Sequence, residues 1–175
     1  MLLITGSTGF LGRAACSAFL DRGLSVRALS RSQCDWPPGI ESFTSYSLSE
    51  LNSESTVFEG VNCILHLAGR AHVMQETVSD PLSAYRSVNV HETIQFARAA
   101  ALAGVRRFVF ISSIKVNGES ASSFAPFTEN DFVHPVDPYA ISKYEAEIGL
   151  FDLATDTGME VVIVRPPLIY GPGVK

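Results

Sequence analysis

The sequence lacks the features that mark several classes of protein. Its three cysteines are widely spaced, with no CxxC pair or Cys/His cluster, which argues against a disulfide framework and against any metal site. No apolar stretch is long enough for a signal peptide or a membrane span, so we expect a cytoplasmic protein. Basic residues form no stripe: the 13 Lys and Arg are scattered and the net charge is −5, so no nucleic-acid partner is expected.

Apolar runs alternate with helical patterns along the whole chain. This alternation is typical of a parallel sheet covered by helices on both faces, and residues 1–175 fit one domain. The expected strands lie near 1–5, 24–29, 40–45, 61–67, 106–112 and 159–164. The expected helices are 10–22, 81–103 and 138–157, each ending at a glycine that suits a left-handed cap. One weak helix is expected within 47–60, and loops are expected at 30–39 and 113–135.

A glycine-rich turn follows the first expected strand directly. Gly6, Gly9 and Gly12 recur every third residue at the entrance to a helix. Gly6 allows a tight turn, Gly9 allows a pyrophosphate to approach the backbone, and Gly12 allows close packing of helix on strand. The helix N-terminus then offers free N–H groups to the phosphates. The predicted cofactor-binding residues of this turn are Gly6, Thr8, Gly9, Phe10, Leu11 and Gly12.

The end of the second expected strand bears on the choice between NAD and NADP. Dinucleotide-binding turns of this kind usually have an Asp or Glu there, which accepts from the adenosine ribose hydroxyl. Here the sequence reads Leu29-Ser30-Arg31, and an arginine can pair with a 2′-phosphate. We therefore favour NADP slightly over NAD. Two alternatives stay open: Arg31 is a surface charge, or Asp35 supplies the carboxylate.

Tyr139 and Lys143 form a candidate acid/base pair. Asp137 and Pro138 are typical of an N-cap and a first helical residue, so the tyrosine and the lysine, four residues apart, share one helix face. A nearby ammonium favours phenolate over phenol, which predicts that the pKa of Tyr139 falls from about 10 toward neutrality.

Six ordered motifs resemble those of the extended short-chain dehydrogenase/reductase family, and within it the NAD-dependent epimerases and dehydratases of the UDP-glucose 4-epimerase type. The resemblance covers essentially all 175 residues. The motifs are Thr5 to Gly12, His66-Leu67-Ala68-Gly69, Asn89 to Thr93, Ile111-Ser112-Ser113, Tyr139 to Lys143, and Arg165 to Gly173.

The resemblance implies a catalytic triad of Ser113, Tyr139 and Lys143. Ser113, with Ser112 as the alternate serine, would hold the substrate oxygen, Tyr139 would move the proton, and Lys143 would also hold the nicotinamide ribose. Further implied cofactor-binding residues are Leu67, Ala68 and Gly69, which would border the dinucleotide, and Pro166 and Leu168, whose backbone would face the nicotinamide. His66 is interpreted as a packed histidine at a strand end, and Asn89 as a brace behind the site.

The sequence departs from the family pattern at three places. Val116-Asn117-Gly118 stands where Val-Tyr-Gly is common, which puts a sugar contact in doubt. Tyr46-Ser47-Leu48 replaces Gly-Asp-Leu and removes an adenine-binding carboxylate. The chain also reaches only Lys175, so we expect the C-terminal substrate lobe to be largely missing.

These observations predict a doubly wound α/β domain, a Rossmann fold with strand order 3-2-1-4-5-6, that binds NAD(P) at the carboxyl ends of the strands. The leading function is epimerisation of a sugar linked to a nucleotide or a lipid pyrophosphate, through a transient keto sugar. The alternatives are an NADPH-dependent reductase of a 4-keto sugar or another carbonyl and, less favoured, a non-enzymatic dinucleotide sensor. A homodimer is the candidate assembly.

Overall fold

A computed structural model describes residues 1–71, 78–118 and 126–173 of the chain. It contains a six-stranded sheet in which each strand is parallel to its neighbours, in the order β3-β2-β1-β4-β5-β6. The strands are β1 (Leu2–Thr5), β2 (Val26–Ser30), β3 (Ile40–Thr44), β4 (Cys63–His66), β5 (Arg107–Ile111) and β6 (Glu160–Val164). The expected strand order and the doubly wound fold are confirmed.

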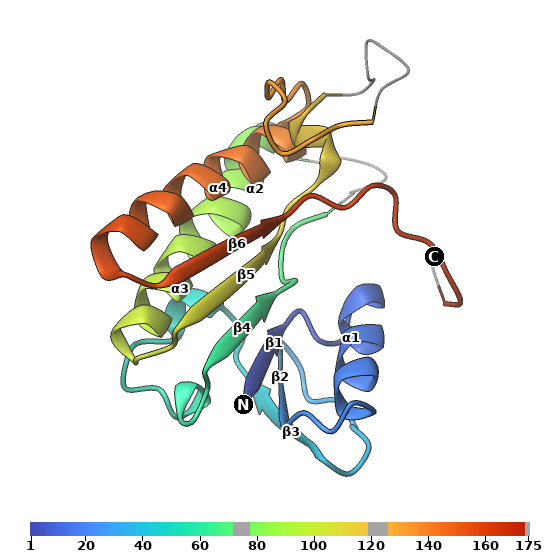
Figure 1. Ribbon diagram of the computed structural model, residues 1–175, viewed down its shortest axis with the longest axis vertical. Coiled ribbons are helices and arrows are strands. Elements are labelled where there is room, and N and C mark those ends of the chain that lie inside the picture. Colours follow the sequence, from blue (N-terminus) through green and yellow to red (C-terminus); the bar gives the residue numbers. More distant parts are fainter. Residues whose placement is uncertain (72–77, 119–125, 174–175) are drawn as a thin grey trace.

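Helices cover both faces of this sheet. Helix α1 (Phe10–Leu20) lies beside β1 and β2 on one face, whereas α2 (Pro81–Arg86), α3 (Thr93–Leu102) and α4 (Pro138–Thr157) lie together on the other, as Figure 1 shows. The core divides in the same way. Leu3 belongs to the larger cluster with Phe96 and Phe108, whereas its neighbour Ile4 packs with Cys16 and Val26 toward α1. This division follows from the alternation of side chains along a strand.

The cap signals in the sequence mark the helix boundaries well. Asp137 accepts a hydrogen bond from the backbone N–H of Ala140 at 2.7 Å, and Pro138 is the first residue of α4. Gly158 ends this helix with a φ of 74°, in the left-handed region that disfavours side chains. Gly23 and Gly104 have the same sign of φ at the ends of α1 and α3, although α1 ends at Leu20, two residues before the expected Arg22.

The segment 81–103 is not the single α-helix that the sequence predicts. A π-helical turn, η3 (Ser87–Glu92), separates α2 from α3. A π-turn adds one residue to the helical circuit and shifts the register of the side chains that follow, and such turns are frequent at functional sites. Apolar periodicity does not reveal it, because residues on both sides of the turn still face the core.

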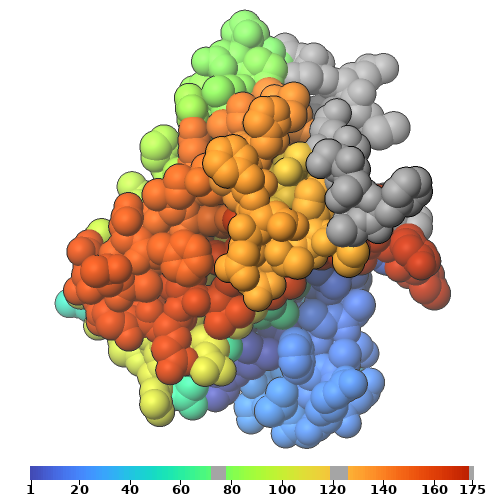
Figure 2. Space-filling view, turned by 45° about the horizontal axis from the view of Figure 1, so that its top comes forward, coloured from blue at the N-terminus to red at the C-terminus, as the bar shows by residue number. Residues whose placement is uncertain are grey.

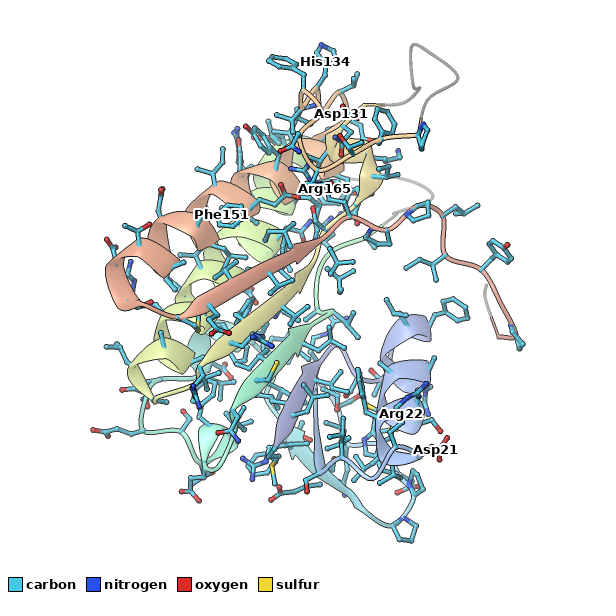
Figure 3. The ribbon with its side chains drawn as sticks, viewed as in Figure 1. Asp21, Arg22, Asp131, His134, Phe151 and Arg165 are labelled. Atoms are coloured by element: carbon cyan, nitrogen blue, oxygen red, sulfur yellow. The ribbon has the colours of Figure 1, made fainter. Side chains whose placement is uncertain are left out.

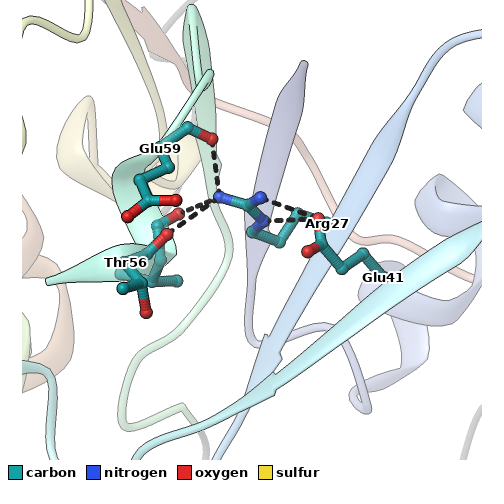
Figure 4. Close-up of polar contacts among 5 residues, drawn as sticks. Arg27, Glu41, Thr56 and Glu59 are labelled. Carbon is teal, nitrogen blue, oxygen red and sulfur yellow. Dashed lines mark hydrogen bonds and ion pairs between the residues drawn. The ribbon is translucent and has the colours of Figure 1, made fainter.

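The weak helix expected within 47–60 is instead a pair of short 3-10 turns, η1 (Leu48–Glu50) and η2 (Thr56–Phe58). A buried arginine holds the second turn, as Figure 4 shows. Arg27 of β2 donates from Nη1 to the carbonyl oxygens of Thr56, Val57 and Glu59 at 3.2, 2.8 and 2.8 Å. Its Nε donates to the carboxylate of Glu41 at 2.8 Å. The short connection therefore needs no regular helix to satisfy its backbone.

Candidate functional site

The glycine turn between β1 and α1 lies at the carboxyl edge of the sheet. Gly6 has a φ of 63°, and a Cβ built on it would lie 2.7 Å from the backbone nitrogen of Ala68. A Cβ on Gly12 would overlap the carbonyl oxygen of Gly6. Ser7 anchors the turn because its hydroxyl donates to the carbonyl of Leu29 at 3.0 Å. Glycine is thus required at the two ends of the turn for two different steric reasons.

A cleft of about 430 Å³ opens over this turn. Its walls come from the glycine turn, the carboxyl ends of β2 and β4, the segment that follows β3, and the π-turn η3. The lining residues are Gly6, Thr8, Gly9, Leu29, Ser30, Arg31, Ser45, Tyr46, Ser47, Leu48, Leu67, Ala68, Gly69, Val88 and Glu92. Six predicted cofactor-binding residues besides Arg31 therefore line one cleft, whereas Asp35, the alternative carboxylate, does not line it.

The start of α1 suits an anionic ligand. The N-cap residue Gly9 offers no side-chain cap, and the first turn carries no acidic residue. The partial positive charge of the helix end therefore remains uncompensated by its own side chains. Together with the backbone cradle at Gly6 and Gly9, this arrangement fits the pyrophosphate of a dinucleotide. Phe10, Leu11 and Gly12 form the first helical turn and do not line the cleft.

Ser113 and Tyr139 lie together although 26 positions separate them in the sequence. Ser113 precedes the 3-10 turn η4 (Ile114–Val116) at the end of β5, and Tyr139 is the second residue of α4. The Ser113 hydroxyl lies close enough to the Tyr139 phenol to lower its pKa. Ser112 faces elsewhere: it is buried, and its hydroxyl donates to the carboxylate of Glu147. The geometry thus distinguishes the two serines, and Ser113 is the one beside the tyrosine.

The predicted fall in the pKa of Tyr139 is wrong for this structure. Burial raises the pKa of the phenol, and the charges of Asp137 and Tyr85 act in the same direction, against the hydrogen bond from Ser113. Lys143 does not counter this rise, because its ammonium lies over the ring of Phe110, 3.8 Å from the centroid. The shared helix face did not guarantee contact between the two polar groups.

Lys143 is a buried cation with few polar contacts. Its side chain is 5% exposed and, within the part of the chain that the structure describes, its ammonium makes no hydrogen bond or ion pair. Burial lowers its pKa to about 7, although the charge of Glu147 acts in the opposite direction. The lysine can therefore carry or release a proton near neutral pH.

Two ion pairs brace the elements that carry the site, and the sequence analysis missed both. Arg165, at the end of β6, pairs with the buried Glu147 of α4 at 2.5 Å and also donates to the side-chain oxygen of Asn117 at 3.1 Å. Lys115 reaches Asp137 at 2.6 Å and so joins the Ser113 turn to the start of α4. No local spacing signals either pair, because each joins residues that lie far apart in the sequence.

Asn89 braces the back of the site, as expected. Its side-chain oxygen accepts from the backbone N–H of Arg70 at 2.8 Å. Its amide nitrogen donates to the carbonyl of Arg70 and to the hydroxyl of Ser142, both at 3.0 Å. Because Ser142 precedes Lys143 on α4, Asn89 fastens the π-turn both to the segment after β4 and to α4.

The segment after β6 crosses the carboxyl edge toward α1, and Figure 3 shows it leaving the strand at Arg165. The carbonyl of Pro166 accepts from the backbone N–H of Ile114 at 3.0 Å, beside the Ser113 turn. Leu168 and Tyr170 are each 82% exposed, and the last described residues stand out from the body of the molecule (Figure 2). Pro166 thus lies near the Ser113 turn, whereas the side chain of Leu168 points to solvent.

In 1–71, 78–118 and 126–173, no group of three or more His, Cys, Asp or Glu side chains could hold a metal ion. None of the helices in those ranges has the length and apolar character needed to cross a membrane. Part of the predicted loop 113–135, residues 119–125, lies outside the described residues.

The sequence and the fold both match known proteins. The profile of the NAD dependent epimerase/dehydratase family matches residues 2–175. A UDP-glucose 4-epimerase of Vibrio cholerae is 42% identical over 179 residues, which cover 99% of this chain and 53% of that protein. A GDP-6-deoxy-D-mannose reductase of Pseudomonas aeruginosa is 30% identical and is matched over 99% of this chain and 54% of its own length.

A solved structure gives the same fold. MoeE5 in complex with UDP-glucuronic acid and NAD superposes with a TM-score of 0.86 at 27% identity, over 99% of this chain and 56% of that one. The chain spans about half the length of the curated relatives described above.

Proposed function

The chain belongs to the NAD dependent epimerase/dehydratase family, and from this premise we propose that it carries the cofactor cleft and the acid/base group of a nucleotide-sugar epimerase. The family and its relatives support a sugar-modifying enzyme that uses a nicotinamide cofactor. The choice of epimerase follows the Vibrio cholerae relative, and the nucleotide carrier follows the same protein.

The observation that carries the proposal is the proximity of the Ser113 hydroxyl to the Tyr139 phenol, where η4 and the start of α4 meet near the carboxyl edge of the sheet. With its pKa raised by burial, the phenol is protonated at neutral pH. Ser113 holds the reacting sugar oxygen, and Tyr139 exchanges a proton with that oxygen. Because the phenol is an acid in this state, it must first release its proton to act as a base toward the sugar hydroxyl.

Lys143 is the third residue of the proposed acid/base group, beside Ser113 and Tyr139. A cation in low dielectric stabilises a nearby phenolate strongly, so movement of the ammonium from the Phe110 ring toward Tyr139 lowers the barrier to proton release. The residues of the cleft fit a dinucleotide, which when bound supplies a hydride acceptor and donor for the sugar carbon. The protein contributes orientation and a tuned acid/base.

The test is an assay with UDP-glucose in which product formation is measured directly and the reduced nicotinamide is followed by its absorbance. An epimerase forms product while the nicotinamide stays constant. Tyr139→Phe is the matched inactive variant, since it removes one hydroxyl and keeps the ring. Product formation by Tyr139→Phe at the wild-type rate would contradict the proposed acid/base.

A reductase is the second candidate, and one relative together with one residue favours it. The Pseudomonas aeruginosa relative is a GDP-6-deoxy-D-mannose reductase, and Arg31 lines the cleft at the end of β2. The same assay separates the two functions when a 4-keto nucleotide sugar and reduced nicotinamide are supplied in place of UDP-glucose. A reductase consumes one reduced nicotinamide for each product formed, whereas an epimerase consumes none.

We also propose that NADP(H) is slightly favoured over NAD(H). Arg31 lies next to Ser30 in the lining of the cleft, where a 2′-phosphate would meet a guanidinium. Among the described residues, the single acidic one in the lining is Glu92, which comes from the π-turn and not from the end of β2. The ratio of the two dissociation constants, measured by calorimetry, tests this preference.

A further inference from the structure

His66 ends β4 in a fully enclosed aromatic site. The imidazole is 1% exposed, and its ring centroid lies 5.8 Å from Phe96, 5.3 Å from Phe108 and 5.8 Å from Phe110. The interpretation of this residue as a packed strand-end histidine is confirmed. Aromatic packing does not provide hydrogen-bond partners for the two ring nitrogens, and a buried polar atom without a partner is costly.

The hydroxyl of Thr5 fixes the role of one ring nitrogen. The Oγ1 atom accepts from the backbone N–H groups of Leu67 and Ala68 at 3.2 and 3.1 Å, and it lies 3.0 Å from Nδ1 of His66. A hydroxyl has one proton and two acceptor lone pairs. Since the two amides occupy both lone pairs, the hydroxyl proton must point to Nδ1, which is then an unprotonated acceptor.

The other ring nitrogen must therefore carry the proton of the neutral imidazole. Nε2 lies 3.1 Å from Oγ1 of Thr93, the first residue of α3, and so donates to it. The Thr93 hydroxyl donates in turn to the carbonyl of Val88 at 3.5 Å, across the π-turn η3. The hydrogen bonds thus run in one direction, from the amides of Leu67 and Ala68 through Thr5, His66 and Thr93 to Val88.

The two ends of this relay both lie in the lining of the cofactor cleft. Leu67 and Ala68 line the wall at the end of β4, and Val88 lines the wall made by η3. We propose that His66 is a positioning residue, which as the Nε2–H tautomer holds the Leu67 and Ala68 peptides and the π-turn in the register that the dinucleotide requires. This inference rests on the proposed function, since it takes the dinucleotide as the occupant of the cleft.

The surroundings of His66 keep it neutral, as the relay requires. Burial lowers its pKa to about 3, and Lys143, the charged group that faces it from α4, acts in the same direction. The groups that face it from β1, β5 and α3 are Thr5, Phe108, Phe110, Thr93 and Phe96, which carry no charge. A protonated Nδ1 would donate to the Thr5 hydroxyl. The hydroxyl oxygen has only two lone pairs, so one of the two amides would lose its acceptor.

The first experiment reads the tautomer directly. In the chain labelled with nitrogen-15 at histidine, we expect His66 to show a protonated Nε2 and an unprotonated Nδ1 throughout pH 6 to 8, with or without cofactor. A purely structural histidine has no need of a particular tautomer. An Nδ1–H tautomer, or titration of His66 within this range, would overturn the proposal.

The second experiment uses matched variants. Thr5→Val removes the hydroxyl and keeps the side-chain shape, whereas Thr5→Ser keeps the hydroxyl and serves as its control. We expect Thr5→Val to weaken binding of the preferred nicotinamide dinucleotide about tenfold, and to speed hydrogen exchange at the Leu67 and Ala68 amides about tenfold, which corresponds to loss of one buried hydrogen bond. Thr5→Ser should stay close to the wild type on both measures.

His66→Phe extends the same test to the centre of the relay. The phenyl ring preserves the aromatic contacts and removes both nitrogens, so it should reproduce the effects of Thr5→Val. Should His66→Phe fail to fold, the tautomer and the Thr5 pair still decide the question. Wild-type exchange at both amides in Thr5→Val would refute the relay.

The outcomes separate this inference from the proposed function. If the wild-type chain binds neither NAD(H) nor NADP(H), the proposed function fails, while the tautomer and the amide exchange still show whether the relay exists. If the chain binds cofactor and Thr5→Val binds it equally well, the proposed function stands and the positioning role is wrong.

Discussion

Two buried cations lie at opposite ends of the strands, and they differ in how many polar partners surround them. Arg27, near the amino edge, makes hydrogen bonds to three carbonyl oxygens and to the carboxylate of Glu41. Lys143, near the carboxyl edge, has its ammonium over the ring of Phe110, and its pKa is lowered to about 7. The acceptors around the arginine match the geometry of its guanidinium.

The difference suggests separate roles for the two edges: the amino edge stabilises the fold, and the carboxyl edge carries the candidate site. A buried charge whose hydrogen bonds are satisfied holds its neighbours in place, and its removal leaves several acceptors without a donor. A buried charge with few polar contacts costs free energy in the folded state, and such groups gather at functional sites. We therefore expect variants at the two edges to separate folding from function.

The largest expected effect is at the carboxyl edge. Tyr139→Phe should lower turnover by a factor on the order of 10² to 10⁴, because the phenol is the proposed acid/base. Cofactor affinity and the free energy of unfolding should change little, since the ring and its contact with Tyr85 remain. Steady-state kinetics of the catalytically active protein, with calorimetry of NAD(H) binding, measure both. A comparable fall in cofactor affinity would mean that the residue is a structural part of the cleft.

The next effect contrasts the two cations. Arg27→Met should destabilise the fold by about 3 kcal/mol, because it leaves the carbonyls of η2 and the carboxylate of Glu41 without their donor. Lys143→Met removes an ammonium that is costly to bury, so its stability should equal or exceed that of the wild type while cofactor affinity falls. Urea unfolding and calorimetry give the two quantities. Equal destabilisation by both variants would contradict the proposal that the amino edge stabilises the fold while the carboxyl edge serves function.

The pH dependence of stability sharpens the same contrast. Lys143 releases its proton near pH 7 in the folded state and near pH 10.5 in the unfolded state. Between these values the unfolded state binds more protons, so this group makes stability rise with pH, by at most about 1.4 kcal/mol per pH unit.

The measurement is the difference in unfolding free energy between the wild type and Lys143→Met from pH 7 to pH 10. The wild type should gain stability relative to the variant as the pH rises. Two parallel curves would indicate that the lysine has an ordinary pKa.

The smallest expected effect concerns Arg31 in the cleft. Arg31→Asp should shift the ratio of NADP(H) to NAD(H) dissociation constants roughly tenfold toward NAD(H), because it replaces a phosphate partner by a repelling carboxylate. Arg22→Asp, at the far end of α1 in Figure 3, is the control for net charge. Equal shifts in both variants would make Arg31 a surface charge.

Local signals in the sequence accounted for much of the fold and the cleft. The glycine turn, the Asp137 cap and the glycine at the end of α4 each depend on neighbours within a few residues, and each is present in the structure. Six of the residues predicted to bind the cofactor, besides Arg31, line the cleft. Such features could be predicted because a turn or a helix cap depends on the backbone within one turn of the chain.

The features that escaped prediction all depend on contacts between distant segments. The π-turn η3 is stabilised where Asn89 meets Arg70 and Ser142, and periodicity within the helix does not contain that information. The selection of Ser113 over Ser112 depends on Glu147, which lies 35 positions after Ser112 and accepts the hydrogen bond of its hydroxyl. The spacing of Tyr139 and Lys143 placed them on one face, but the ring of Phe110 decided where the ammonium lies.

The sequence by itself determined the order of strands, the position of the glycine turn and the residue types available for proton transfer, because these follow from local backbone preferences and the alternation of strand and helix. Only the tertiary structure decided the electrostatic state of those residues. The pKa of Tyr139, Lys143 and His66 depends on how completely water is excluded and on which side chains face each group from other elements. Burial and long-range contact exist only once the sheet and its helices are assembled.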